Sequence, residues 1–464
     1  MAAAVFTLDR TLLSGSLNDV IERHLVAGGL TGSGDGHRAV GGGAERWRSG
    51  PQASGAATRA SGWAVSSVAA VAAGVADELV ERVHPYVWPL LDGHRLAGDR
   101  IVLATQAPEP LVAPFAARLG IGDVVGPVWE VRDGAYTGHL DGGRPWGRGK
   151  LVALRAWARE AAVPLRSAHA YAGSASDANI LAAVRQPVAA NPDAVLAALA
   201  RLEGWPIRHL DVPPEVVKVA GRELQQWLRP LSHPALVPNA RIELRDVERI
   251  PASGPVILVF NHRSYFDPTA MAVLISRAGR TARFLGKKQV FDAPVVGRIA
   301  TALGGIRVDR SSGSDEPLDA AATALDAGQL VCLAPQGTIP RGPSFFDTEL
   351  KGRWGAARLA ARTGAPVIPV GLWGTERVWP RSSRIPAFSL RPPPVTVAVG
   401  LPVDLGRVDA DVDTRAIMAA IVALLPPEAR VRRSPTPEEL QRTFPPGYRG
   451  DASRESERRP GTDK

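Results

Sequence analysis

His262 and Asp267 follow an apolar segment, Val256–Phe260, that is typical of a buried strand. If the chain turns into a helix after that strand, the four intervening residues allow the two side chains to meet. The carboxylate would then hold the imidazole tautomer and stabilise the imidazolium, while the other ring nitrogen takes a proton from a hydroxyl group. No serine or cysteine nucleophile is needed if the substrate's own hydroxyl attacks. The alternative is a histidine that caps a helix or packs in the core.

Two lysines and then three further blocks follow this pair in order, each next to an apolar segment. Lys287 and Lys288 come after a predicted strand, and a Gly-Gly-Ile segment leads to Arg310. A Pro-Gln-Gly-Thr segment ends at Thr338, and Ala-Pro-Val-Ile-Pro closes the series at Pro369. Together with the histidine block, these resemble the four ordered motifs of the glycerolipid acyltransferases, specifically the 1-acylglycerol-3-phosphate acyltransferases, over about residues 235–425.

The resemblance implies a reaction and a role for each motif residue. His262, oriented by Asp267, would deprotonate the sn-2 hydroxyl of lysophosphatidate, and the oxygen would attack the thioester of acyl-CoA or acyl carrier protein to make phosphatidate. The implied enzyme is a 1-acylglycerol-3-phosphate O-acyltransferase of phospholipid biosynthesis, with the acyl thioester as co-substrate, no cofactor and no metal. The implied substrate-binding residues, which hold the phosphate through charge and close backbone approach, are Lys287, Arg310, Gln336, Gly337, Thr338 and Arg341.

One departure from the family bears on the acceptor. The family's third block usually reads Pro-Glu-Gly-Thr-Arg-Ser, whereas Gln336 replaces the acid and Ile339 replaces a phosphate-binding arginine. Glutamine keeps a hydrogen-bond acceptor and gains a donor, and Arg341 could reach the same region. Another lysophospholipid or a glycolipid therefore stays open as the acceptor.

A second group of polar residues follows apolar runs in the first 210 residues. The segment from Val5 to Leu12 resembles the first motif of haloacid dehalogenase-type phosphatases, in their phosphoserine-phosphatase-like branch, and later motifs of that family line up as well. The chemistry has been removed: Thr7 stands at the nucleophilic aspartate, and Gly173 stands where an aspartate would bind Mg²⁺. Since Mg²⁺ needs hard oxygen ligands and a threonine hydroxyl is a weak nucleophile, we expect no hydrolysis and no Mg²⁺. The degenerate site comprises Thr7, Asp9, Thr105, Lys150 and Asp177.

The elements that must position these residues alternate between strand and helix, which predicts α/β domains with parallel sheets. Polar residues at strand ends would lie where such sheets bind ligands. We expect an N-terminal Rossmann-like domain of the haloacid dehalogenase type over residues 1–210, with a flexible insertion at 28–62. A linker at 211–234, a C-terminal α/β acyltransferase domain at 235–425 and a disordered tail at 426–464 follow.

Composition and charge restrict the partners. The chain has 464 residues, a net charge of +9 and one cysteine, which excludes an internal disulfide framework. Residues 251–400 hold 18 Lys/Arg against 10 Asp/Glu, so the excess suits an anionic membrane surface. No nucleic-acid module accompanies this charge. We find no secretory signal and no spanning segment, and expect a cytoplasmic protein bound peripherally to the inner face of the cell membrane.

Two further hypotheses stay open. The lost residues of the first domain are also compatible with a non-catalytic role in assembling lipid enzymes. Acyl carrier protein, as the alternative acyl donor, is a candidate partner of the acyltransferase. A bifunctional phosphatase and acyltransferase is the other alternative to a single acyl transfer activity.

Overall fold

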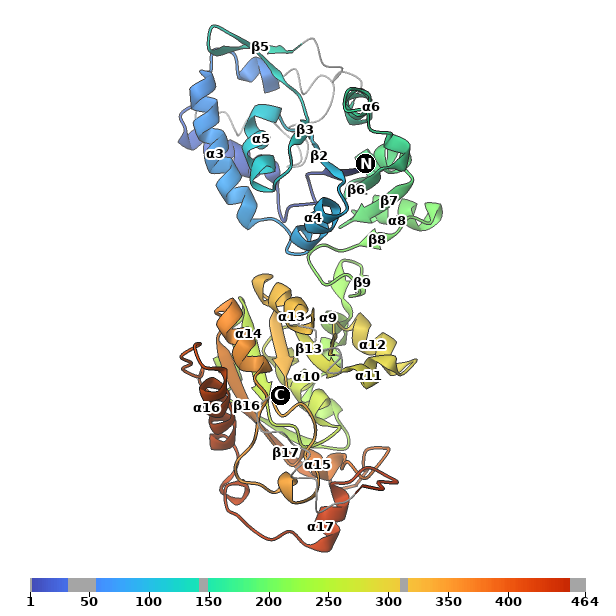
Figure 1. The fold of residues 1–464 in the computed structure, drawn as a ribbon, viewed down its shortest axis with the longest axis vertical. Helices are drawn as coiled ribbons and strands as arrows, with labels where there is room; N and C mark the ends of the chain where they lie inside the picture. The colour runs from blue at the N-terminus through green and yellow to red at the C-terminus, as the bar shows by residue number, and fades with distance from the viewer. Residues whose placement is uncertain (1, 32–55, 142–148, 309–315, 451–464) are drawn as a thin grey trace. The chain divides into compact units, whose positions relative to one another are not determined.

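The computed structural model describes residues 2–31, 56–141, 149–308 and 316–450. The chain forms two compact units, Met1–Pro214 and Glu215–Lys464. Both are α/β, with mainly parallel sheets covered by helices (Figure 1). The predicted fold class is thereby confirmed. Most of the predicted insertion at 28–62 lies outside the described residues.

The first unit is built on a six-stranded parallel sheet in the order β3-β2-β1-β6-β7-β8. A separate antiparallel hairpin, formed by β4 and β5, accompanies it. The strands of the sheet and hairpin are β1 Ala3–Thr7, β2 Arg100–Ala104, β3 Asp123–Val125, β4 Trp129–Arg132, β5 Ala135–Leu140, β6 His169–Ala172, β7 Gln186–Ala190 and β8 Ile207–Arg208.

Both faces of this sheet are buried, which explains its continuous apolar strands. Side chains alternate along β1, so that Phe6 packs in one hydrophobic layer and Val5 in the other. The layer with Phe6 is covered by α1 Leu17–Ala27, α3 Val65–Glu81, α4 Val87–Leu96 and α5 Glu109–Arg118. The layer with Val5 is covered by α6 Lys150–Glu160, α7 Ala178–Leu181 and α8 Ala194–Glu203.

The second unit is built on a seven-stranded sheet in the order β11-β17-β16-β12-β15-β13-β14. Only the β16–β17 pair is antiparallel, so β12, β13, β15 and β16 end at the same edge. The strands are β11 Arg241–Arg245, β12 Val256–Phe260, β13 Ala282–Lys287, β14 Ile306–Val308, β15 Leu330–Leu333, β16 Val367–Trp373 and β17 Pro394–Val399.

Helices again cover both faces of the sheet. Leu258 of β12 packs with Met271 and Leu274 of α10 (Asp267–Arg277), whereas Val259 faces the opposite layer. That opposite layer contains α13 Glu316–Asp326, α14 Gly355–Thr363 and α16 Ala410–Ala423. Shorter helices are α11 Lys288–Asp292, α12 Val296–Ala302 and α15 Thr375–Val378.

The expected linker at 211–234 instead belongs largely to the second unit. It contains β9 Lys218–Val219, β10 Arg222–Glu223 and α9 Leu224–Leu228. Glu223 forms a two-point ion pair with Arg283 of β13, with N···O distances of 2.6 and 2.9 Å. Because Arg283 is almost completely buried, its charge needs this carboxylate. The segment is therefore packed structure and not a spacer.

The expected disordered tail is also wrong for residues 426–450. This stretch contains α17 (Pro437–Arg442), whose N-terminus is closed by a capping box between Thr436 and Glu439. Phe444 is buried, and the neighbouring Thr443 accepts a hydrogen bond from the Gly342 amide at 2.8 Å. A few aromatic and capping residues suffice to order a polar segment when a folded surface receives them. Residues 451–464 lie outside the described residues.

Within the described residues, no helix combines the length and apolar character that crossing a bilayer requires.

Candidate active site

The histidine loop of the second unit connects β12 to α10 at the carboxyl edge of the sheet. Asp267 is the first residue of α10, and Pro268 in the first turn favours a helix start there. The Nδ1 atom of His262 lies 2.8 Å from Oδ2 of Asp267. The same oxygen accepts the backbone N–H groups of Arg263 at 2.6 Å and Ser264 at 2.8 Å. The carboxylate thus organises the whole loop as well as the imidazole.

The two members of this pair differ in exposure. The Asp267 side chain is fully buried, whereas the His262 side chain is 23% exposed. With Nδ1–H donated to the carboxylate, the Nε2 atom of His262 is the ring nitrogen left to accept a proton from a hydroxyl. The arrangement can perform general base catalysis.

Two neighbouring anchors hold the histidine loop in position. The side-chain oxygen of Gln336 accepts the His262 backbone N–H at 2.7 Å. Asn261 bonds both backbone groups of Leu372: its Nδ2 donates to the carbonyl at 2.9 Å, and its Oδ1 accepts the amide at 2.7 Å. We expected Gln336 to bind substrate. The structure shows its side-chain acceptor positioning the loop, and substrate binding by Gln336 stays a prediction. Asn261 was missed because its partner lies 111 residues away.

Lys287 and Thr338 meet at this same edge. The Nζ atom of Lys287, at the end of β13, donates to Oγ1 of Thr338 at 2.9 Å. Gly337 adopts a left-handed φ of +68°, which glycine tolerates best. Its amide donates to the Ala334 carbonyl at 2.9 Å, so the expectation that this amide binds phosphate is not supported by the geometry.

The remaining two predicted binding residues have different outcomes. Arg310 lies outside the described residues. The Arg341 guanidinium lies 5.3 Å from the ring centroid of Tyr448, in the segment that we expected to be disordered. The structure thus ties Arg341 to the C-terminal segment.

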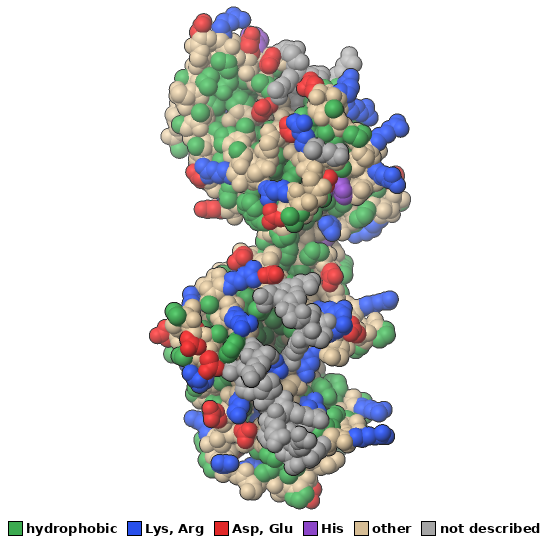
Figure 2. Space-filling view, in the orientation of Figure 1, with side chains coloured by type: hydrophobic (Ala, Val, Ile, Leu, Met, Phe, Trp, Pro, Cys, Tyr) green, Lys and Arg blue, Asp and Glu red, His purple; other side chains and the backbone are tan. Residues whose placement is uncertain are grey.

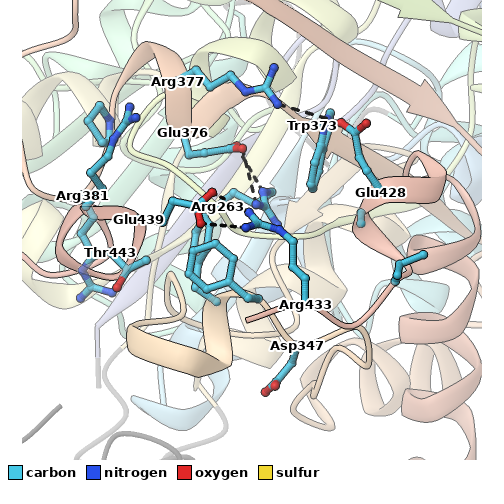
Figure 3. Close-up of a pocket in the computed structure, with 16 residues that line it drawn as sticks. Arg263, Asp347, Trp373, Glu376, Arg377, Arg381, Glu428, Arg433, Glu439 and Thr443 are labelled. Carbon is cyan, nitrogen blue, oxygen red and sulfur yellow. Dashed lines mark hydrogen bonds and ion pairs between the residues drawn. The ribbon is translucent and has the colours of Figure 1, made fainter. Parts of the chain in front are cut away.

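Sequence reasoning missed a cluster of arginine–glutamate ion pairs directly beside His262. The Arg263 guanidinium lies 4.3 Å from the ring centroid of Phe345 and 4.4 Å from that of Trp373. Its Nε donates to Glu376 at 3.2 Å, and both residues line a pocket with Arg433 and Glu439 of the C-terminal segment (Figure 3). Burial tends to raise the pKa of Glu376, but the Arg263 charge outweighs it and the pKa is lowered. The sequence carries no signal for this arrangement, because an arginine packed between two aromatic rings and paired with a carboxylate has no characteristic sequence spacing.

The degenerate site of the first unit lies at the carboxyl edge of its own sheet. Lys150 Nζ is paired with Asp177 Oδ1 at 2.6 Å, and both side chains are largely buried. Thr7 Oγ1 lies 2.8 Å from Thr11 Oγ1, and Thr105 Oγ1 accepts the Ala107 amide at 3.0 Å. Each of these polar side chains therefore has a hydrogen-bond or ion-pair partner within the protein.

Asp9 is the other acidic residue at this site. Although part of the residue is exposed, its carboxyl loses hydration, and this raises its pKa. The Lys150 charge opposes the rise and the Asp177 charge adds to it.

The residues present do not fit the Mg²⁺ ion that phosphatases of this type use. Gly173 supplies no ligand, and a Cβ atom there would lie 2.8 Å from the Ala190 carbonyl oxygen and 2.9 Å from Cβ of Arg10. Asp177 is already neutralised by Lys150. With Thr7 in place of the nucleophilic carboxylate, too few hard oxygen ligands remain for an octahedral ion.

Comparison with known proteins finds a family match within each unit. Residues 4–182 match the haloacid dehalogenase-like hydrolase family, and residues 241–373 match the acyltransferase family. The chain is 34% identical over 159 residues to the phosphoserine phosphatase SerB1 of Mycobacterium tuberculosis, covering 34% of this chain and 52% of that protein. It is 31% identical over 137 residues to a histidinol-phosphatase of Neisseria meningitidis, covering 29% and 62%. The chain thus spans between about half and two thirds of the length of these relatives.

A solved structure also resembles part of the chain. The 1-acyl-sn-glycerophosphate acyltransferase PlsC of Thermotoga maritima is 22% identical, covers 46% of this chain and 82% of its own, and gives a TM-score of 0.34.

Proposed function

We propose that this chain, which joins a haloacid dehalogenase-like domain to an acyltransferase domain, moves a fatty acyl group to the sn-2 hydroxyl of lysophosphatidate. The donor is the thioester of acyl-CoA or acyl carrier protein, and the product is phosphatidate. The observation that carries the proposal is the contact between His262 and the buried Asp267 at 2.8 Å, within a domain of the acyltransferase family.

The proposed reaction uses His262 as base and then as acid. Its Nε2 takes the proton of the sn-2 hydroxyl while the hydroxyl oxygen attacks the thioester carbonyl. The new C–O bond forms and the C–S bond breaks. The imidazolium, stabilised by Asp267, returns the proton to the departing thiolate. Both substrates are consumed stoichiometrically, so no cofactor enters this proposal.

The phosphate of the acceptor needs positive charge and donors near the histidine. Lys287 and the Thr338 hydroxyl, in contact at 2.9 Å, are the described candidates, and Arg310 is proposed with them. Charge-assisted hydrogen bonds of this kind both attract and orient a phosphate.

The direct test is transfer of a labelled acyl group from oleoyl- or palmitoyl-CoA to lysophosphatidate. We expect activity in the purified protein, none in His262→Ala, and full activity in His233→Ala, which changes an exposed histidine. Equal residual transfer by the wild type and by His262→Ala would refute the proposal.

A different acyl acceptor is the second candidate, because Gln336 and Ile339 depart from the family pattern. An acceptor panel of lysophosphatidate, other lysophospholipids and glycolipids separates the two candidates. Preference for an acceptor without a terminal phosphate would favour this second candidate.

A phosphatase activity of the first domain is the bifunctional alternative, given relatives named as phosphatases. We propose that this domain does not hydrolyse phosphate esters, since Thr7 and Gly173 have replaced two functional carboxylates. Release of phosphate from phosphoserine above background, abolished by Asp9→Ala, would establish the bifunctional alternative.

We also propose peripheral binding to the cytoplasmic face of an anionic membrane, as a lipid substrate requires. Apolar side chains are exposed near α12, at Val295 and Ile299, and in the loop before β17, at Phe388 and Leu390. Both segments follow strands that end at the active-site edge. On the face drawn in Figure 2, basic side chains are spread over both units with acidic ones among them. Because no uniformly basic face is seen there, we propose that insertion of the exposed apolar side chains into the lipid adds to the electrostatic attraction.

Co-sedimentation with vesicles tests this binding. We expect Ile299→Asp to weaken association with vesicles of anionic lipid, whereas Val131→Asp, at a comparably exposed position of the first unit, leaves it unchanged. Equal binding by both variants would contradict the assignment of this surface.

A further inference from the structure

Three ligand-type side chains gather at the amino edge of the first unit's sheet, the edge opposite the degenerate phosphatase site. His94 comes from α4, Asp99 immediately precedes β2, and His169 is the first residue of β6. Because β1 pairs in parallel with both β2 and β6, the starts of these strands lie close together. No residue of the cluster takes part in the proposed acyl transfer or in the motifs of either family described above.

The three side chains lie near enough to one another to share a metal ion. One ligand atom from each residue lies within 4.8 Å of the other two. His94 Nδ1 is 2.8 Å from Asp99 Oδ2, and the His94 and His169 rings meet edge to face with centroids 4.8 Å apart. Around a tetrahedral ion with bonds of about 2.0–2.1 Å, donor atoms stand roughly 3.3 Å apart. Small side-chain rotations would bring all three atoms to such an ion.

A further contact orients the central histidine. His94 Nε2 lies 2.9 Å from the hydroxyl oxygen of Tyr171. Tyr171 is buried and stacks on Phe6, with centroids 4.6 Å apart and the planes inclined by 9°. If Nδ1 binds an ion, Nε2 carries the proton and donates it to this oxygen. A hydrogen bond from the second ring nitrogen is how proteins orient a metal-bound histidine.

We propose that His94, Asp99 and His169 bind a divalent transition-metal ion of the Zn²⁺ type. Two imidazoles and one carboxylate suit Zn²⁺ or Co²⁺, whereas Mg²⁺ and Ca²⁺ prefer oxygen ligands throughout. The fourth position would be taken by water. The ion would tie α4 to the starts of β2 and β6, and so stabilise the edge of the sheet that lies away from the degenerate site.

The test uses the full-length protein without an affinity tag, stripped of metal by a chelator. We expect about one equivalent of Co²⁺ to bind with the intense visible absorption of a tetrahedral site, to be displaced by Zn²⁺, and to raise the thermal midpoint. His169→Gln should remove the bound equivalent and the midpoint shift. His139→Gln, which changes an exposed histidine of the same unit, should keep both, and so should His262→Ala.

Two results would overturn the proposal. The first is a wild type that binds no Co²⁺ or Zn²⁺, which would mean that the cluster is a metal-free hydrogen-bond network. The second is a full equivalent of bound ion in His169→Gln or in Asp99→Asn. Circular dichroism of the metal-free variants checks that they are folded, and wild-type stoichiometry decides the question if they are not.

Discussion

The two units place polar residues at the same position of similar scaffolds, with opposite consequences. In each, a parallel strand, β6 or β12, ends at a loop that leads to an acidic residue at the start of a helix. In the second unit Asp267 contacts a histidine with an accessible ring nitrogen. In the first, Asp177 is neutralised by Lys150. The comparison teaches that the sheet fixes where chemistry can occur, while a few side chains decide whether it does.

Loss of the Asp267 carboxylate should have the largest effect. Asp267→Asn removes the negative charge that stabilises the imidazolium and weakens the acceptance of two loop N–H groups. We expect kcat for acyl transfer to fall by about 100-fold or more, with the KM for acyl-CoA changed far less. Steady-state kinetics measure this. Retention of most of the wild-type kcat would mean that the Asp267–His262 pair, like the Lys150–Asp177 pair of the first unit, has no catalytic role.

Restoring the missing carboxylates tests the other half of the comparison. Gly173→Asp must displace the Ala190 carbonyl or Arg10, so we expect it to lower the free energy of unfolding by about 1–3 kcal/mol. Combined with Thr7→Asp, it should still release no phosphate from phosphoserine in the presence of Mg²⁺. Denaturant unfolding and phosphate release measure the two effects.

Ser176→Asp is the matched control, because it adds the same charge at an exposed neighbouring position. Phosphatase activity in the Thr7→Asp, Gly173→Asp variant would mean that the first unit lost its chemistry through these two side chains alone, and not also through the close packing around Gly173.

Removal of the Lys287 ammonium sharpens the assignment of the phosphate end of the site. Lys287→Ala should raise the KM for lysophosphatidate by about tenfold, equivalent to ~1.4 kcal/mol, and change kcat less. Lys287→Arg should recover part of the affinity. Lys288→Ala, one position further along, should leave the KM within about twofold. An equal effect of both substitutions would mean that the positive potential of the region, and not direct contact with Lys287, attracts the phosphate.

The smallest expected effect concerns the ion pair between Arg263 and Glu376 and the dependence of the free energy of unfolding on pH. The folded-state pKa of Glu376 is below its ordinary value, so its contribution is present above that ordinary pKa and is lost as pH falls through the lower one. Glu376→Gln should therefore be less stable than wild type by about 1 kcal/mol near pH 7. Urea unfolding between about pH 7 and pH 3 should show this difference shrink, and a constant difference would contradict the charge-based account.

Local signals predicted much of the molecule. The apolar run Val256–Phe260 located β12, since this strand is buried on both faces and its sequence is continuously apolar. The pairing of His262 with Asp267 followed from their spacing because the strand-to-helix turn is short. The family resemblance placed Lys150 and Asp177 in the same site, but only the folded chain showed that they form an ion pair.

Other features depended on partners far apart in sequence. Composition suggested a linker at 211–234 and a disordered tail from 426, yet Glu223 binds Arg283 and Thr443 binds Gly342. A polar composition indicates only that a segment on average prefers to stay solvated. It gives no sign that a buried charge elsewhere, such as Arg283, needs a carboxylate from that segment.

By itself, the sequence determined the two α/β units, the histidine and aspartate of the acyltransferase domain, and the absence of carboxylates at Thr7 and Gly173. The two α/β units follow from local periodicity, whereas the roles of these residues follow from the resemblance to the two families. Only the tertiary structure decided that Gln336 holds the histidine loop, that Arg263 lies between two rings, and that His94, Asp99 and His169 converge. The physical reason is that a parallel sheet brings strand ends together whatever their separation along the chain, so side-chain partners at those ends are set by topology.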